Sequence, residues 1–342
     1  MKMLLSDETL FKDENVFDFS YLPEQFTHRD AQLKSLAMCI KPAMRGAKPL
    51  NALLYGPPAT GKTTAIKTVF QQLEEETDRA VAVHVNCQIY SSPFRVFSEI
   101  HKKMFGYLPP ETGVPFSNVY DKIFQKLSKE GKTLIVALDD LSGGDEILYN
   151  IIRAHEAFPK AKAAVFAVMP ENAMHKLDGR VRSVFQPQQI SFPLYNAGEI
   201  FDILKGRAEI GFYPNVISDD IIRKIATIAF RKNDSRFGIE LLKQSAMTAE
   251  KNSSRKIGII DVDNALKAMM PLRAERSNDE EAILNSLAKG PMKSGELYDS
   301  LKNKMSYSGL YRTLKKLKEA NLIEIKETNL KKGKTRIISK RK

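Results

Sequence analysis

The fold of this chain is decided by the stretch Leu53-Leu54-Tyr55-Gly56-Pro57-Pro58-Ala59-Thr60-Gly61-Lys62-Thr63-Thr64. This stretch matches the pattern G-x-x-x-x-G-K-[ST]; a short apolar run at residues 52–55 leads into it, and an amphipathic segment at residues 65–73 follows it directly. Strand, loop and helix in this order are the context that a phosphate-binding loop requires. The sequence therefore predicts a nucleoside triphosphate site rather than a glycine turn with a chance Lys-Thr pair.

Each residue type in this loop has a physical task. Glycines at 56 and 61 let successive backbone N–H groups converge on phosphate oxygens, and the helix N-terminus adds its positive dipole end. We expect Lys62 to reach the β- and γ-phosphates and the Thr63 hydroxyl to ligate Mg²⁺. The expected cofactors are ATP or ADP with Mg²⁺. The predicted cofactor-binding residues are Gly56, Pro57, Pro58, Ala59, Thr60, Gly61, Lys62, Thr63 and Thr64.

A second half of the site is predicted where the apolar run at residues 133–138 ends in two carboxylates. A strand that delivers an Asp to the metal side of a phosphate loop completes a P-loop site, so we expect Asp139 to hold the metal through water. Asp140 stands where a base for the attacking water would be. Most enzymes of this type have Glu there, and Asp is one methylene shorter, while base catalysis depends strictly on hydrogen-bond reach. We therefore expect a slow ATPase.

Two regions of different periodicity make up most of the chain. Up to about residue 194, apolar runs alternate with helical patterns, which predicts a parallel sheet covered by helices on both faces. The strands are expected at residues 52–55, 81–85, 133–138, 163–168 and 189–192. Between residues 195 and 270 only helical periodicity is present, and residues 1–20 are expected to pack weakly. The helices are expected at residues 199–210, 219–230, 235–250 and 261–270.

Composition excludes several classes of protein. The 342 residues are 43% hydrophobic and 27% charged, which is typical of a soluble globular chain, and no apolar run approaches the length of a membrane span. Asp7 and Glu8 argue against a signal peptide. Cys39 and Cys87 lack the spacing of a metal site and are expected to be buried. The sequence thus favours a cytoplasmic protein that does not bind a membrane.

Positive charge is concentrated at the C-terminal end. Residues 278–342 contain 16 Lys and Arg against eight Asp and Glu, so this fifth of the chain carries +8 of the total net charge of +12. Such asymmetry favours a nucleic-acid-binding end, with a solvated basic tail as the alternative.

The same region has the pattern of a winged helix-turn-helix. Helices are expected at residues 279–287, at 294–302 and from Ser306 or Ser308 onward, followed by a wing with strands at 323–326 and 335–339 and a loop at 327–333. Leu310, Leu314 and Leu317 form an apolar stripe on the third helix. Its opposite face and the wing tip are predicted to contact DNA, and the alternative is a winged helix that binds protein. The predicted DNA-binding residues are Ser308, Arg312, Lys315, Lys316, Lys331, Lys332 and Lys334.

Several segments together resemble one family, the archaeal origin-recognition and cell-division-control replication initiators, which are AAA+ ATPases. Residues 19–29 (FSYLPEQFTHR) resemble their entry segment, and residues 83–87 (VHVNC) resemble the strand that follows their phosphate loop. Residues 177–183 (LDGRVRS) resemble their arginine-bearing motif. Residues 233–236 (NDSR) lie where they carry Gly-Asp-Ala-Arg. The resemblance runs from about residue 18 to 270 and extends loosely into the tail.

This resemblance implies an α/β fold in three parts: a P-loop AAA+ parallel-sheet domain (1–194), an α-helical lid (195–272) and a C-terminal winged helix-turn-helix (278–342). It implies that Arg236 in the lid senses the γ-phosphate. Arg180, or alternatively Arg182, would be an arginine finger that acts on the nucleotide of a neighbouring protomer. Asp140, Arg236 and Arg180 are thus the predicted catalytic residues.

The chain departs from the family pattern at two places. Asp140 replaces the usual Glu, and the Asn usually found after the fourth strand is displaced to Asn172, behind Pro170. Both changes concern the orientation of the attacking water. A further segment, residues 101–115, lies where these initiators carry a DNA-touching insertion, and it can equally be read as an ordinary surface connection.

The resemblance implies a function as a DNA replication initiator. Its partners would be double-stranded DNA of a replication origin, the replicative helicase and other initiator protomers, in a cytoplasmic, nucleoid-associated setting. Two other functions fit the residues: a regulatory or signalling P-loop ATPase whose winged helix binds protein, and a loader ATPase that binds DNA without sequence preference.

Overall fold

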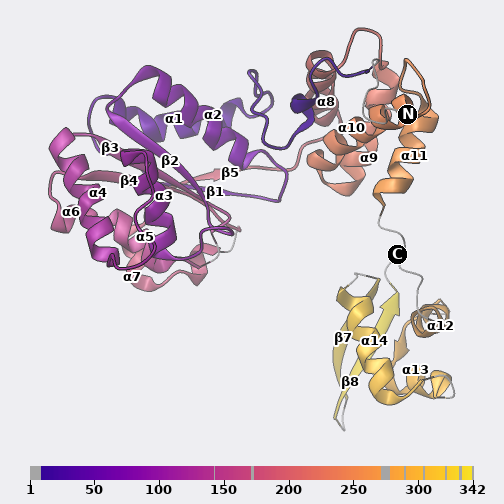
Figure 1. Cartoon of the computed structure of the whole chain (residues 1–342). Helices are drawn as coiled ribbons and strands as arrows, with labels where there is room; N and C mark the ends of the chain where they lie inside the picture. Colours follow the sequence, from indigo (N-terminus) through magenta and orange to yellow (C-terminus); the bar gives the residue numbers. More distant parts are fainter. Residues whose placement is uncertain are drawn as a thin grey trace. The chain divides into compact units, whose positions relative to one another are not determined.

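The computed structural model describes residues 9–340 apart from 142, 171–172, 271–277, 289, 303–304, 320–321 and 331–332. The chain divides into two compact units, residues 1–266 and 267–342 (Figure 1).

The first unit begins with a 3-10 helix η1 (Glu14–Phe17). Its helices are α1 (Asp30–Met44), α2 (Lys62–Glu76), α3 (Pro93–Phe105), α4 (Phe116–Glu130), α5 (Asp145–Ile152), α6 (Ala154–Ala157), the 3-10 helix η2 (Ala173–Lys176), α7 (Gly179–Val184), α8 (Ala197–Gly211), α9 (Asp219–Lys232), α10 (Ser235–Lys251) and most of α11 (Ile259–Met269).

A five-stranded parallel sheet forms the centre of the first unit. Its strands are β1 (Ala52–Tyr55), β2 (Ala80–Asn86), β3 (Thr133–Asp139), β4 (Lys162–Val168) and β5 (Gln188–Ser191). They lie in the order β2-β3-β4-β1-β5, and every neighbouring pair is parallel. All five predicted strands are present, within one residue at each end. Parallel strands bring their carboxyl ends to one edge, so the loops after β1 and β3 share that edge.

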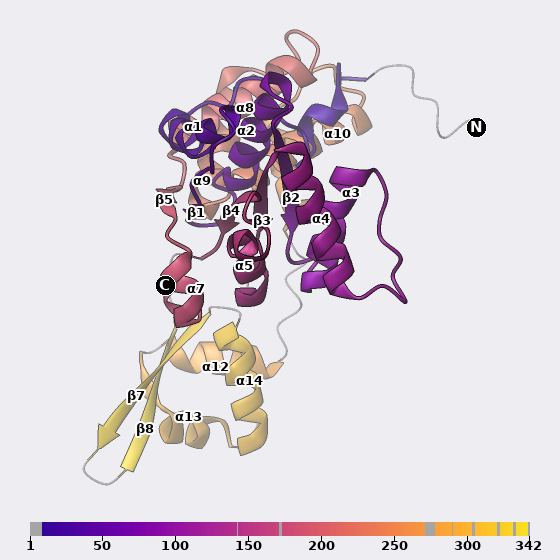
Figure 2. The same ribbon diagram turned by 90° about the vertical axis from the view of Figure 1, so that its left-hand side faces the viewer.

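Helices cover both faces of this sheet, as the near-continuous apolar strands predict. Helices α1 and α2 lie on one face, and α3, α4 and α5 lie on the other (Figures 1 and 2). Alternation along β1 supplies both cores: Leu53 belongs to the core under α3–α5, whereas Ala52 and Leu54 belong to the core under α1 and α2.

The lid is a bundle of α8, α9 and α10, with α11 beginning after it, and each expected helix is present. The N-terminal segment packs on this bundle. Phe11 forms a β-bridge with Phe212, and the ring of Phe17 packs at a tilt against that of Phe212 with centroids 4.6 Å apart. A Cβ on Gly211 would come within 2.4 Å of the Phe17 ring, so this packing requires glycine. The expectation of weak packing is therefore wrong for residues 9–20.

The second unit is a winged helix. It contains α12 (Asn278–Leu287), β6 (Met292–Lys293), α13 (Ser294–Leu301), α14 (Tyr307–Glu319), β7 (Ile323–Leu330) and β8 (Gly333–Lys340). The strands form an antiparallel sheet in the order β6-β8-β7, and its core includes the predicted stripe Leu310, Leu314 and Leu317.

The wing differs from the prediction in length. Residues 327–330 and 333, expected in a loop, continue the two strands, and Glu327 pairs with Arg336 in the ladder. The polar composition of this stretch indicated a loop, but ladder bonds join backbone groups and do not require apolar side chains. Strand β6 was not predicted, because two residues carry no periodicity.

Candidate nucleotide site and nucleic-acid interface

The phosphate loop leaves the end of β1 and enters α2 at Lys62. Gly56 has a φ of 139°, and a Cβ at this position would lie 2.2 Å from the carbonyl oxygen of Phe192. Gly61 has a φ of 89° and forms the N-cap of α2, where a Cβ would lie 2.7 Å from the Tyr195 hydroxyl. Both glycines of the motif are therefore required by the backbone path, independently of any ligand.

The ammonium group of Lys62 lies inside the curl of its own loop. Its Nζ donates to the carbonyl oxygens of Pro57 (2.6 Å) and Gly56 (3.0 Å). Burial lowers the pKa of Lys62, the carboxylates of Asp140 and Asp139 oppose that shift, and the charge of Arg236 adds to it. The lysine is thus held at the loop centre by neutral acceptors that phosphate oxygens can replace.

Thr63 and Asp139, the two predicted metal ligands, are brought together. The Thr63 hydroxyl donates to Oδ2 of Asp139 at 2.6 Å, and Nε2 of His84 on β2 lies 3.0 Å from the same oxygen. Burial disfavours the charge on Asp139, but hydrogen bonds from His84 and Thr63 outweigh it and lower the pKa of this carboxyl. A hydroxyl beside an ionised carboxylate is a donor set that fits Mg²⁺. His84 was not predicted from the sequence as a residue of this site. The one signal for it in the sequence is its position near the end of β2, the strand beside β3.

Asp140 differs from its neighbour in exposure. Asp139 is buried, whereas Asp140 is exposed and has a φ of 53°, and its backbone N–H donates to Oδ1 of Asp139 at 3.1 Å. The left-handed turn at Asp140 directs the chain away from β3 at the sheet edge where the phosphate loop lies.

A cavity of about 560 Å³ opens beside the phosphate loop. It is lined by residues 19–27, by Gly61, Thr63 and Thr64 of the loop and helix α2, and by α8 and α10 of the lid. Arg207 of α8 donates to the carbonyl oxygen of Val16 and lies over the Tyr21 ring, 4.5 Å from its centroid. The entry segment is therefore one wall of the cavity, and it is held to the lid.

The lid touches the phosphate loop directly at the start of α10. The Ser235 hydroxyl donates to the carbonyl oxygen of Ala59 at 2.7 Å. Asp234 caps the helix by accepting from the N–H groups of Arg236 and Phe237. Arg236 lines the cavity, close enough to Lys62 to affect its pKa. The resemblance singled out Arg236, but the role of Ser235 has no local sequence signal.

Arg29 is a second residue without a predicted role. It is only 3% exposed, and its guanidinium donates to the carbonyl oxygens of Thr60 (3.0 Å) and Pro193 (2.7 Å). The same group lies 3.7 Å from the centroid of the Tyr195 ring. Arg29 thus joins the phosphate loop to the segment that leads from β5 into the lid.

The predicted arginine finger lies away from this cavity. Arg180 is at the start of α7, its side chain is 83% exposed, and Nε lies 3.3 Å from the carboxylate of Asp178. Neither Arg180 nor Arg182 lines the cavity, and the role of either as an arginine finger stays a prediction.

The predicted DNA face of α14 is exposed at four positions. Leu310, Leu314 and Leu317 point into the core, and Ser308, Arg312, Lys315 and Lys316 are exposed. Lys331 and Lys332 lie outside the described residues, as does Asn172. Lys334 lies in β8.

Segment 101–115 comprises the last turn of α3 and the connection to α4. His101 is buried and its Nδ1 lies 3.0 Å from the carbonyl oxygen of Tyr107, while Lys103 pairs with Glu74. Tyr107 and Leu108 are exposed. The segment contains an exposed connection, as expected, but two members of its basic start are already engaged.

Cys39 and Cys87 are free and buried, as the sequence predicts. Burial raises the pKa of Cys39 to about 11 and that of Cys87 to about 12, so both thiols stay protonated near neutral pH. Among the described residues, no group of three or more His, Cys, Asp or Glu side chains could hold a metal, and no helix is both long and apolar enough to span a membrane.

Comparison with known proteins agrees with this architecture. Residues 25–157 match the AAA ATPase domain family, and residues 201–267 match the Cdc6 AAA+ ATPase-type lid domain. The ORC1-type DNA replication protein 2 of Methanosarcina mazei is 42% identical, covering 98% of this chain and 94% of that protein. The ORC1-type DNA replication protein 2 of Methanothermobacter thermautotrophicus is 40% identical, covering 95% of this chain and 90% of that protein.

Solved structures give the same result. The ORC1 protein of Aeropyrum pernix, solved in complex with DNA, has a TM-score of 0.71 and 26% identity, covering 98% of this chain and 94% of its own. The Cdc6p of Pyrobaculum aerophilum, at 24% identity, shares the fold with a TM-score of 0.67 over 97% and 94%. The resemblance and the three-part AAA+ fold class are therefore confirmed. With a nucleotide-binding AAA ATPase domain, a Cdc6-type lid and close relatives over nearly its whole length, this chain belongs to the ORC1-type family of DNA replication proteins.

Proposed function

We propose that this chain is an ATP-dependent replication initiator that binds double-stranded DNA of a replication origin and recruits or loads the replicative helicase. The observation that carries the proposal is the joining, in one chain, of a phosphate loop on which a lid rests and a winged helix with an exposed basic face. The A. pernix relative, solved with DNA, supports the same partner. We place the protein in the cytoplasm, associated with the nucleoid.

Nucleotide acts in this proposal as a conformational switch. Lys62, which now donates to the carbonyls of Gly56 and Pro57, would turn to the phosphates of a bound nucleotide, and Arg236, which lines the cavity from the lid, would contact the terminal phosphate. Ser235 at the start of α10 already contacts the phosphate loop. Nucleotide binding to that loop would therefore alter the position of α10. The lid angle therefore depends on which nucleotide is bound.

Hydrolysis is proposed to be slow. Thr63 and Asp139 would hold Mg²⁺, which when bound neutralises charge on the phosphates. Asp140 would orient or deprotonate the attacking water, with a side chain shorter than Glu. Arg180 would complete the site of a neighbouring initiator protomer.

Truncation after Arg273 tests the DNA proposal. Genome-wide mapping of the bound DNA supplies origin-like sequences, and the full and truncated chains are then titrated on origin-like and random duplexes at two salt concentrations. We expect the truncated chain to keep ATP binding and lose most DNA affinity. If the truncated chain instead binds each duplex as tightly as the full chain does, the winged helix is not the DNA-binding element. That result would favour a signalling ATPase. Helicase recruitment is tested by whether the helicase associates with origin duplex only when this chain is present.

A further inference from the structure

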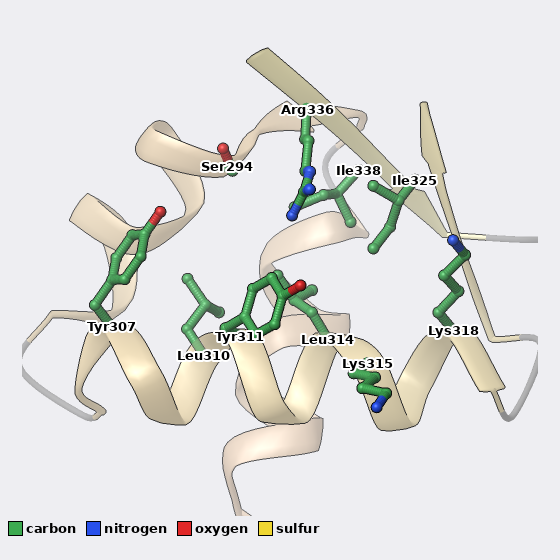
Figure 3. A pocket seen from close by; sticks show the side chains of 10 residues that line it. All are labelled: Ser294, Tyr307, Leu310, Tyr311, Leu314, Lys315, Lys318, Ile325, Arg336 and Ile338. Atoms are coloured by element: carbon green, nitrogen blue, oxygen red, sulfur yellow. The ribbon is translucent and has the colours of Figure 1, made fainter. Parts of the chain in front are cut away.

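A groove of about 610 Å³ lies between α14 and the strands β7 and β8 of the second unit (Figure 3). Its floor is apolar, formed in part by Leu314 and Ile338. Tyr307 and Tyr311 line it from α14, and the cationic side chains of Lys315, Lys318 and Arg336 surround it. It is therefore an apolar surface with an aromatic wall and a positive rim.

This groove adjoins the predicted DNA face and shares one residue with it, Lys315. Successive helical residues are about 100° apart, so Tyr307, Tyr311 and Lys318 fall on the flank of α14 beside the wing. Arg312 and Lys316 fall on the opposite side of the helix. The duplex-contacting face proposed above does not account for the two tyrosines.

The two aromatic rings are exposed and already positioned. Tyr307 is 62% exposed and Tyr311 is 57% exposed. The ring of Tyr298 meets that of Tyr307 edge-on, with centroids 5.1 Å apart. The guanidinium of Arg336 lies 5.8 Å from the centroid of the Tyr311 ring. A ligand that fills the groove would bury apolar and aromatic surface beside a cationic side chain.

We infer that this groove binds an unpaired base of a DNA strand, with its ring against Tyr311 and its phosphates near Lys315 and Lys318. A paired base is stacked on its neighbours and shows proteins only its edges, so a closed duplex offers phosphates to the lysines but nothing flat to the tyrosines. An unpaired strand offers both base faces and phosphates, which is the combination that aromatic, basic grooves bind. The inference rests on one part of the proposed function, namely that the second unit binds DNA.

The groove and the outer face of α14 would then bind different parts of one site. The outer face holds duplex, and the groove holds a base that has left the stack. Such a protein binds a partly opened duplex more tightly than a closed one, which stabilises strand separation beside the bound duplex.

A tryptophan reporter tests the contact directly. The chain contains no tryptophan, so Tyr311→Trp introduces a single one at the groove. We expect its fluorescence to fall when oligo(dT) is added to the full-length protein, because stacking on a base quenches the indole. Fluorescence that stays unchanged while oligo(dT) binds, as measured by anisotropy of labelled DNA, would overturn the inference.

Affinity measurements separate the groove from the duplex face. Tyr311→Ala should lower affinity for oligo(dT) and for a duplex with a central unpaired bubble by roughly tenfold, and leave a closed duplex of the same flanks within about twofold. Tyr311→Phe keeps the ring and should restore binding. Tyr213→Ala, which removes a similarly exposed tyrosine (51%) from the first unit, is the matched control.

The outcomes distinguish the two proposals. If Tyr311→Ala weakens closed duplex as much as bubbled duplex, or changes neither, the groove does not bind an unpaired base. If the wild-type chain binds closed duplex but shows no preference for the bubble, the inference alone fails. If it binds none of the DNA probes, the proposed function fails with it.

Discussion

The hydroxyl of Ser235 donates a 2.7 Å hydrogen bond to the carbonyl oxygen of Ala59, so the first turn of α10 rests on the phosphate loop. Ala59 has a φ of 58°, and this conformation turns its carbonyl toward the lid. The contact links the part of the lid that carries Arg236 to the backbone that would surround phosphate.

Ser235→Ala removes this link. A neutral hydrogen bond contributes about 1 kcal/mol, so we expect hydrogen exchange in the first turn of α10 to rise by about fivefold in nucleotide-free protein. Exchange measured by mass spectrometry checks this. Ser35→Ala, which removes a hydroxyl bonded only within α1, should leave α10 unchanged. Unchanged exchange in the Ser235 variant would mean that the contact does not hold the lid.

Lys62→Ala should abolish ATP binding, because the ammonium is the main side-chain charge that the loop offers to phosphate. Equilibrium binding of a fluorescent ATP analogue measures this, with the exposed Lys41→Ala on α1 as control. An unchanged affinity of the Lys62 variant for the ATP analogue would show that the nucleotide site is assigned wrongly.

The two neighbouring carboxylates should behave differently. Asp140→Ala is expected to leave ATP binding nearly intact and to reduce an already slow hydrolysis. Asp139→Ala should weaken the binding that depends on Mg²⁺, since it removes the carboxylate beside Thr63. Turnover and binding with Mg²⁺ or EDTA separate the effects. Fast wild-type turnover that Asp140→Ala does not change would exclude Asp140 as the base.

The lowered pKa of Asp139 predicts a pH dependence of stability. Its ionised form contributes stability above the unfolded pKa of about 3.9, and that contribution is lost as the pH falls through the lower folded value. The wild type should therefore lose more stability than Asp139→Asn below about pH 4. Thermal melts from pH 6 to pH 3 measure the difference. Parallel curves for the two proteins would show that the pKa of Asp139 is not lowered.

Arg312→Ala should weaken duplex binding and relax sequence preference if this side chain reads a base, a contact typically worth about 1–3 kcal/mol. Arg231→Ala, an exposed arginine on α9, is the matched control. Lys332→Ala should weaken binding about equally on all sequences and reduce its salt dependence, as loss of a phosphate contact does. Titrations on origin-like and random duplexes at two salt concentrations measure both effects, and equal affinities for wild type and Arg312→Ala would exclude a DNA contact by Arg312.

Most of the fold could be predicted because its signals are local. The apolar runs at β1–β5 are short, nearly continuous and separated by helical periods, so a sheet was the one arrangement that buried them. The Gly56–Lys62 motif and the carboxylates after β3 specified the centre of the site. The wing was predicted too short because Glu327 and its neighbours carry no apolar alternation.

The residues that sequence reasoning missed act through tertiary contacts. Arg29 is one charged residue before a helix, and nothing near it in sequence shows that its partners are carbonyls at Thr60 and Pro193. Ser235 resembles an ordinary residue at a helix start, and its partner lies 176 positions away. The packing of Phe17 depends on Gly211 in the same way.

The placement of the N-terminal segment has a mechanical consequence. Residues 9–21 pack with the lid, the chain then passes the cavity to α1, and it returns to the lid after β5. The chain therefore connects the lid to the sheet domain twice, once before α1 and once after β5. Two connections restrict how the lid can rotate against the sheet more than a single connection would.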